Sequence, residues 1–160
     1  EEINEYKDSI SLFKDAAVTM VKKDGFINPM TIGWGALGVL WSTPCLSVYI
    51  HKTRYSKVLF DDAKTFAVCF FNDQYKDQVR YFGRVSGRDE DKVKNSTLKV
   101  NDTEIAPYFE EAELVIICKK MAQSDFDINS LPEGRIENWY KEEGVHTIYY
   151  GEIQKILRKI

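Results

Sequence analysis

The strongest constraint on the fold is that short apolar runs alternate with turn signals along the whole chain. This alternation is typical of sheet-rich domains. The run from Ala16 to Val21 is a predicted strand, and it is followed by Asp24-Gly25, a pair that supplies the positive φ angles of a tight hairpin turn. The returning strand is therefore expected to run from Phe26 to about Gly33.

Four further runs have the composition of strands. They are Leu46–Ile50, Thr65–Phe71, Leu114–Cys118 and Thr147–Ile153. The first alternates apolar and polar residues, which predicts a half-buried strand, whereas Thr65–Phe71 is apolar enough to be buried on both faces. Gly151 interrupts the last run, so we expect a bulge or a close approach of another segment there.

Helices are predicted to be few and short. One is expected from Asn72 or Asp73 as N-cap to Gly83 as its C-terminal stop, and a second over Lys57–Asp62, capped by Ser56. The first would bury residues at i, i+4 and i+7, namely Tyr75, Val79 and Phe82. Six or more strands with two or three short helices predict a mainly β domain, either a barrel or an α+β fold. At 160 residues, the chain 1–160 is expected to form a single domain.

Composition excludes several classes of function. The chain has 22 basic and 25 acidic residues and a net charge of −3, so it lacks the concentrated basic excess that nucleic-acid binding requires. There is no apolar run long enough for a membrane span. Glu and Asp residues are spread through the first twenty positions, where a signal peptide would have its apolar core. The three scattered cysteines, at 45, 69 and 118, fit reduced thiols in the cytoplasm and no metal site.

One motif points in a misleading direction. Gly33, Gly35 and Gly38 spell the GxGxxG fingerprint of dinucleotide-binding folds. That fingerprint requires a helix directly after the glycines, within a βαβ unit. Pro44 and the next strand follow too soon to leave room for such a crossover, so we reject this interpretation. The glycines are instead expected where a flat ligand or another segment approaches closely.

Four segments, taken together, resemble the flavin reductase-like, flavoredoxin-like family of FMN-binding split barrels. They are Asn28–Gly35 (NPMTIGWG), Arg54–Lys57 (RYSK), Ser86–Lys92 (SGRDEDK) and Tyr149–Ile153 (YYGEI). They occur in the family's order and spacing and span roughly residues 10–155. The resemblance is weakest from about Met121 to Val145. It implies a mainly β split barrel with few short helices, which binds FMN and forms a homodimer.

The resemblance also implies a set of cofactor-binding residues. The flavin ring would lie on the first segment, through Asn28, Met30, Thr31, Gly33, Trp34 and Gly35, with Trp34 or Trp139 covering it. Backbone N–H groups that the glycines expose would bond the ring and stabilise the charge it gains on reduction. Phe66, Phe70 and Phe71 are assigned to the core.

The FMN phosphate would be bound by Arg54, Ser56 and Lys57, because a forked guanidinium and a helix N-terminus both attract phosphate. The alternative interpretation of this segment is an ordinary capped helix start with solvated charges. Ser86, Arg88 and Lys92 would gather at the flavin edge or the phosphate. Their alternative is a solvent-facing charged turn in which Asp89 caps a helix.

The function implied is that of a cytoplasmic FMN-binding flavoprotein, an NAD(P)H-dependent oxidoreductase of the flavin reductase-like type. The chemistry would take place at the flavin N5, so no catalytic side chain is expected. His51 and His146 are assigned to the surface or to satisfied core positions, and no metal is expected. An electron-acceptor protein is a possible partner. Two alternatives remain open: a flavoredoxin-type electron-transfer protein without nicotinamide turnover, and a cofactor-free barrel that serves as a binding module.

Overall fold

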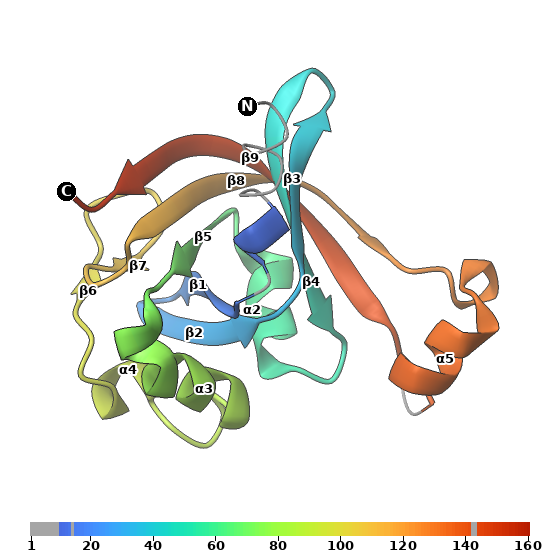
Figure 1. Ribbon diagram of the computed structural model, residues 1–160, viewed down its shortest axis with the longest axis horizontal. Helices are drawn as coiled ribbons and strands as arrows, with labels where there is room; N and C mark the ends of the chain where they lie inside the picture. Colours follow the sequence, from blue (N-terminus) through green and yellow to red (C-terminus); the bar gives the residue numbers. More distant parts are fainter. Residues whose placement is uncertain (1–9, 14, 142–143) are drawn as a thin grey trace.

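A seven-stranded antiparallel sheet forms the framework of the computed structural model, which describes residues 10–13, 15–141 and 144–160. Its strand order is β2-β1-β5-β8-β9-β4-β3, and a separate two-stranded sheet pairs β6 with β7. The large sheet curls so that β2, at one edge, also contacts β4 near the other edge (Figure 1). The first nine residues, whose acidic side chains entered the argument against a signal peptide, lie outside the described part of the chain.

The elements have the following bounds. The strands are β1 (Ala17–Lys23), β2 (Phe26–Ile32), β3 (Gly35–Leu40), β4 (Thr43–His51), β5 (Thr65–Phe70), β6 (Val100–Asn101), β7 (Tyr108–Phe109), β8 (Leu114–Asp125) and β9 (His146–Arg158). The helices are α2 (Tyr55–Asp62), α3 (Lys76–Arg84), α4 (Lys92–Asn95) and α5 (Glu133–Trp139), with single 3₁₀ turns η1 (Asp73–Tyr75) and η2 (Ile128–Ser130).

The central strands are buried on both faces. In β5, Phe66 and Val68 point into the core enclosed by the curled sheet, while Ala67 and Cys69 point to a second core on the outer face. α3 and the segment of residues 98–112 cover this outer core. The prediction of a doubly buried strand at Thr65–Phe71 is therefore confirmed, although the strand ends at Phe70.

The glycine-rich segment is a strand rather than a nucleotide-binding turn. Gly35–Leu40 forms β3, which pairs antiparallel with β4 through a hairpin whose turn residues Trp41 and Ser42 have positive φ. The rejection of the dinucleotide interpretation is thus confirmed. This hairpin stands clear of the curled sheet at the top of Figure 1.

β8 and β9 extend well beyond the predicted runs. They remain paired from Leu114 opposite Arg158 to Asp125 opposite Thr147. The chain between them forms η2 and α5, which lie at the end of this long arm, away from the sheet (Figure 1). The sequence indicated only the β9 side of this arm, as the predicted strand Thr147–Ile153. Residues 119–125 of β8 are exposed or half-buried, and neither they nor α5 were predicted.

Three details of the predicted helices were wrong. α3 continues through Gly83 to Arg84, because Gly83 is a packing position: a Cβ atom there would lie 2.9 Å from Cβ of Thr31. α2 begins at Tyr55 without a side-chain cap, since the Ser56 hydroxyl is bonded to Asn28 instead. The residue that caps α4 is Asp91, which accepts from the backbone N–H of Lys94, and not Asp89.

The close approach expected at Gly151 is confirmed. A Cβ atom at this position of β9 would lie 2.6 Å from Cβ of Cys118 and 2.6 Å from the ring of Phe66. Both neighbours are buried in the core. The pairing of β8 with β9 also shifts register next to Gly151, between Lys120 and Ala122.

The substitution Gly151→Ala should lower the free energy of unfolding by about 1–3 kcal/mol, because the added methyl group has to displace two buried side chains. Gly38→Ala is the matched control, since a Cβ atom there meets nothing within 4 Å. We expect it to change stability by less than about 0.5 kcal/mol. Urea unfolding followed by circular dichroism measures both, and equal effects would contradict the packing argument.

Candidate functional site

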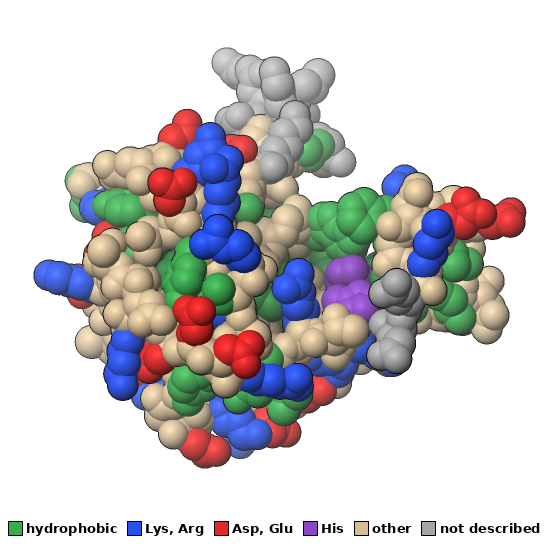
Figure 2. Space-filling view, turned by 90° about the horizontal axis from the view of Figure 1, so that it is seen from below, with side chains coloured by type: hydrophobic (Ala, Val, Ile, Leu, Met, Phe, Trp, Pro, Cys, Tyr) green, Lys and Arg blue, Asp and Glu red, His purple; other side chains and the backbone are tan. Residues whose placement is uncertain are grey.

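A cavity of about 460 Å³ opens where the ends of β2 and β4 and the start of β9 face α5. Six of the sequence-predicted residues line it: Met30, Thr31, Gly33, Trp34, Arg54 and Trp139. Figure 2 shows histidine side chains in a hollow between the main body and the smaller lobe at the right, with hydrophobic surface beside them. The size is within the range of small-molecule and cofactor sites.

The glycines of the first motif have different surroundings. A Cβ atom at Gly33 would meet nothing within 4 Å, so the backbone there is open to the cavity. At Gly35, by contrast, the ring of Phe13 occupies the space that a Cβ atom would need. The close approach expected at Gly35 is therefore made by the chain itself, and Gly35 is not among the residues that line the cavity.

The side chains of Met30 and Thr31 offer the cavity few unbonded polar groups. Met30 is buried in the core inside the curled sheet. The Thr31 hydroxyl donates to the carbonyl of Val79 in α3. What these residues present to the cavity is therefore mainly backbone and apolar surface.

Three of the four sequence motifs meet beside the cavity. Asn28 Nδ2 donates to Ser56 Oγ at 2.7 Å, and both residues are buried. Gly87 is packed so closely on Asn28 that a Cβ atom there would collide with Asn28 Oδ1. Arg88 lies over the ring of Tyr55, with its guanidinium carbon 5.2 Å from the ring centroid.

This junction contains polar groups that the protein does not satisfy. Asn28 Oδ1 is the one buried side-chain oxygen or nitrogen of the described residues without a hydrogen-bond partner. The Ser56 hydroxyl accepts from Asn28, which leaves its own proton free to be donated. An unsatisfied buried acceptor costs about 1–3 kcal/mol, so it is unusual in a stable core and more common at functional sites.

Two cations approach one another at the same place. Arg54 is exposed, and its Nη1 donates a 3.4 Å hydrogen bond to the carbonyl of Gly83. No carboxylate among the described residues forms an ion pair with Arg54. Lys92 is 3% exposed and donates to the carbonyls of Pro29 at 3.0 Å and Phe82 at 2.8 Å. Burial, and then the nearby charge of Arg54, lower the pKa of Lys92 to about 8.

The structure does not bring Lys57 to this junction as a free cation. Its ammonium forms an ion pair with Asp61 at 2.7 Å and lies 3.4 Å from the Tyr149 hydroxyl. Tyr149 in turn donates to Asp61 at 2.6 Å. Hydrogen bonds from Lys57 and Tyr149 keep the pKa of Asp61 below its usual value, against the opposing effect of burial.

Ser86 and Arg88 lie in the turn between α3 and α4. The Ser86 hydroxyl accepts from the backbone N–H of Arg88 at 3.2 Å, which fixes the turn. Arg88 is exposed and stacks on Tyr55 as described above. Neither residue lines the cavity, but both adjoin the junction formed by Asn28 and Ser56.

Both histidines have hydrogen-bond partners, Thr53 for His51 and Tyr140 for His146, but the structure also brings the two together at the cavity, which the sequence did not indicate. His51 ends β4 and His146 begins β9; the two are register partners, with ring centroids 5.0 Å apart, and both line the cavity. Trp34 lies 4.5 Å from the His146 ring. A single sequence does not show which strands pair, so this contact between residues 95 positions apart carried no signal that could have revealed it.

Tyr140 and Trp139 complete this aromatic cluster. The Tyr140 hydroxyl lies 2.9 Å from Nδ1 of His146. Trp139, which the sequence analysis named as a possible cover for a flat ligand, meets Trp34 edge to face with centroids 4.9 Å apart. Burial, followed by the charges of His51 and Arg54, lowers the pKa of His146 to about 4, so its imidazole is neutral at pH 7.

The cysteines are inert packing residues, as predicted. All three are free and buried, and burial raises the pKa of Cys69 and that of Cys118 to about 12. Among the described residues there is no cluster of three or more potential metal ligands. Nor does the described part of the chain contain a helix long and apolar enough to cross a membrane.

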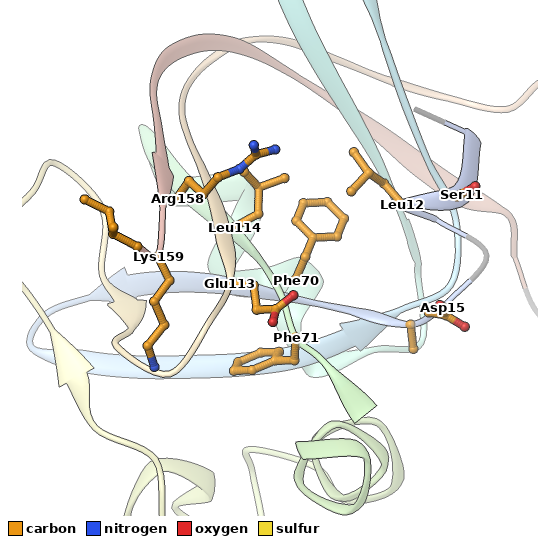
Figure 3. Close-up of a pocket in the computed structure, with 11 residues that line it drawn as sticks. Ser11, Leu12, Asp15, Phe70, Phe71, Glu113, Leu114, Arg158 and Lys159 are labelled. Carbon is orange, nitrogen blue, oxygen red and sulfur yellow. The ribbon is translucent and has the colours of Figure 1, made fainter. Parts of the chain in front are cut away.

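A second cavity, of about 690 Å³, lies at the far end of β8 and β9 (Figure 3). It combines Phe70 and Leu114 with side chains of both charges, among them Glu113 and Arg158. None of the motif residues lines it. Its two cations, Arg158 and Lys159, share the lining with the carboxylates of Asp15 and Glu113.

Comparison with known proteins gives a consistent result. Residues 16–158 match the model of the flavin reductase like domain. No curated protein matches the sequence. Similar solved structures include an FMN-binding protein from Thermus thermophilus, 22% identical with a TM-score of 0.71 over 90% of this chain and 70% of that one.

A second is a flavoredoxin from Methanosarcina acetivorans, 22% identical with a TM-score of 0.72 over 91% of this chain and 68% of that one. A third is the NADH:FAD oxidoreductase SgcE6 of Streptomyces globisporus, 17% identical with a TM-score of 0.69 over 99% of this chain and 84% of that one. At these identities the likeness establishes the fold. The mainly β split barrel that the resemblance implied is confirmed.

The two histidines of the chain make the low pKa of His146 directly measurable. In an NMR titration we expect the His146 imidazole to protonate near pH 4. Because the unfolded chain takes up this proton near pH 6.5, the folded state loses stability as the pH falls from about 6.5 to 4. His51→Gln assigns the resonance and should raise the pKa of His146, since it removes a neighbouring positive charge. Titration of His146 near 6.5 in the intact protein would contradict this.

Proposed function

The chain belongs to the flavin reductase like domain family, and from this premise we propose that it is an FMN-binding flavoprotein that acts as an NAD(P)H-dependent oxidoreductase. The family match and the FMN-binding protein of similar fold support the cofactor. The similar NADH:FAD oxidoreductase supports the nicotinamide donor. Four features of the chain fit the cofactor.

The observation that carries the proposal is the pair of cations Arg54, which lines the cavity, and Lys92, which is buried behind it. The two bind adjacent carbonyls at the end of α3, Arg54 that of Gly83 and Lys92 that of Phe82, and Arg54 has no carboxylate partner among the described residues. Like charges held together in this way favour an anion between or beside them. A phosphate dianion meets that requirement, and the guanidinium of Arg54 matches its geometry.

The second feature is the N-terminus of α2. Arg54 occupies its N-cap position, where no side chain caps the helix. The backbone N–H of Lys57 donates to the carbonyl of Arg54, which leaves those of Tyr55 and Ser56 to bond an anion. Ser56 adds a hydroxyl donor, whose oxygen is held in place by a 2.7 Å hydrogen bond from Asn28 Nδ2. In this proposal Arg54 and Ser56 bind the phosphate, with Arg88 on Tyr55 at its side.

Lys57 and Lys92 have more limited roles than their place in the motifs implied. Lys57 is paired with Asp61 and contributes charge only at a distance. Lys92 uses two of its three N–H donors on backbone carbonyls, so one donor is left for a ligand. Its main effect is to keep a positive charge under the site.

The third and fourth features concern the flavin ring. Gly33 presents open backbone to the cavity, and Trp34 and Trp139 provide flat apolar surface beside it. His146 is neutral at pH 7 because of its lowered pKa, so it offers a hydrogen bond without adding a charge. FMN, when bound, supplies hydride and single-electron transfer at its ring. The chain's residues bind and orient it and exclude water from one face.

We further propose that the protein is a homodimer in the cytoplasm. Edge strand β3 and its turn expose large apolar side chains, with Val39 74% and Trp41 69% exposed, which favours burial against a second copy. The three unpaired cysteines fit a reducing compartment. Electrons would leave to an acceptor protein or a small acceptor.

Arg54→Ala should weaken FMN binding by about 1.5–3 kcal/mol, because a charge-assisted contact to phosphate is lost. The protein is reconstituted with FMN and its affinity is measured from the quenching of flavin fluorescence. Arg80→Ala is the matched control, since Arg80 is exposed on α3 and has only a 4.0 Å contact with Asp77. Lys57→Ala should have a smaller effect than Arg54→Ala.

If the chain binds no FMN, as judged by the visible spectrum of the reconstituted protein, the proposed function is wrong and a cofactor-free barrel is favoured. If FMN binds but Arg54→Ala leaves its affinity unchanged, the phosphate site lies elsewhere.

Anaerobic mixing of the FMN-loaded protein with NADH or NADPH separates the reductase from a flavoredoxin-type carrier. We expect the yellow absorption to bleach within seconds. Dithionite serves as the control that the bound flavin is reducible. Persistence of the yellow form with both nicotinamides, together with bleaching by dithionite, would favour the carrier.

A further inference from the structure

A third cavity, of about 350 Å³, adjoins the one assigned to the flavin and shares Trp34, Tyr49 and Trp139 with it. It lies on the side of the α5 lobe, next to the hollow seen in Figure 2. Nothing in the proposed function occupies it. Its lining differs from that of the flavin cavity, because five of its seven described residues are aromatic.

The walls of this cavity are flat rings at defined angles. Tyr49 and Phe126 are parallel, with an interplanar angle of 3° and centroids 5.9 Å apart. Trp34 and Trp139 meet at 80° and close an adjacent side. Leu131 is also in the lining. Such an arrangement offers a planar ligand both stacking and edge contacts.

One charged side chain lines the cavity. Arg135, in α5, is exposed, and no ion pair or hydrogen bond links its side chain to any other described residue. The described residues that line the cavity include no carboxylate that would compete for it. A single guanidinium binds a carboxylate in a fork, and one carboxylate carries the one negative charge that Arg135 can balance.

The exposed surface of Trp139 adds a driving force. Its side chain is 53% exposed even though it contacts Trp34. A ligand ring seated against it removes apolar surface from water, which favours binding in proportion to the area buried. The volume of the cavity suits one substituted ring rather than a dinucleotide.

We propose that this cavity binds a small aromatic carboxylate, with the ring between Tyr49 and Trp139 and the carboxylate on Arg135. The binding of such a ligand is argued from the lining alone. That the ligand is a substrate or an effector of the flavin site rests on the proposed function. A ligand held here lies against the two tryptophans that also border the flavin cavity.

The test uses benzoate as the probe and tryptophan fluorescence as the signal, on the full chain without FMN and again with FMN. Trp41→Phe removes the exposed tryptophan of the β3–β4 turn, which does not line the cavity. We expect saturable quenching by benzoate and much weaker binding of benzyl alcohol, which has the ring without the charge. Arg135→Gln should weaken benzoate about tenfold and leave benzyl alcohol unchanged.

Arg80→Gln is the control for the loss of one surface charge. No saturable quenching by benzoate, equal binding of benzyl alcohol, or an unchanged benzoate affinity in Arg135→Gln would overturn the proposal. The two proposals fail separately. Benzoate binding to a chain that takes up no FMN removes only the proposed function, and FMN binding to a chain that ignores benzoate removes only this site.

Discussion

The buried ammonium of Lys92 is the interaction on which the architecture of the site depends. A charge that is 3% exposed requires compensating hydrogen bonds, and the carbonyls of Pro29 and Phe82 provide them. These two bonds join β2 to α3 and place the turn of Gly87 against Asn28. Removal of the ammonium would take away both bonds, so this one charge holds the segment of Lys92 to β2 and α3, while the Asn28–Ser56 bond joins the third motif segment to them.

The sheet was largely predictable because burial leaves a local signature. Strands such as Thr65–Phe70, which face a core on both sides, must be apolar at every position, and that pattern can be read from one sequence. The outer half of β8, residues 119–125, gave no such signal, because its side chains are exposed or half-buried. α5, at the end of this arm, has no buried residue and was not foreseen for the same reason.

The site was predictable only as far as short-range chemistry determines it. Gly33 and Arg54 reach the cavity as their motifs implied. Gly35 does not, because Phe13, remote in sequence, fills the space beside it. Lys57 forms an ion pair with Asp61, four residues later in the same helix. Helix geometry favours such a pair, but the spacing alone does not show whether a lysine binds this carboxylate or another group. His51 and His146 meet only through strand pairing, which no local pattern encodes.

Trp139 lines both cavities and belongs to α5, at the end of the projecting arm. The arm contacts the rest of the protein here through several rings. Trp139 meets Trp34, Phe126 stacks on Tyr49, and the Tyr140 hydroxyl lies 2.9 Å from Nδ1 of His146. Trp139 is nonetheless 53% exposed, so an occupant of either cavity that covers this ring removes apolar surface from water. The same side chain therefore favours a ligand on either side of it, at a cost in exposed apolar surface that the free protein bears.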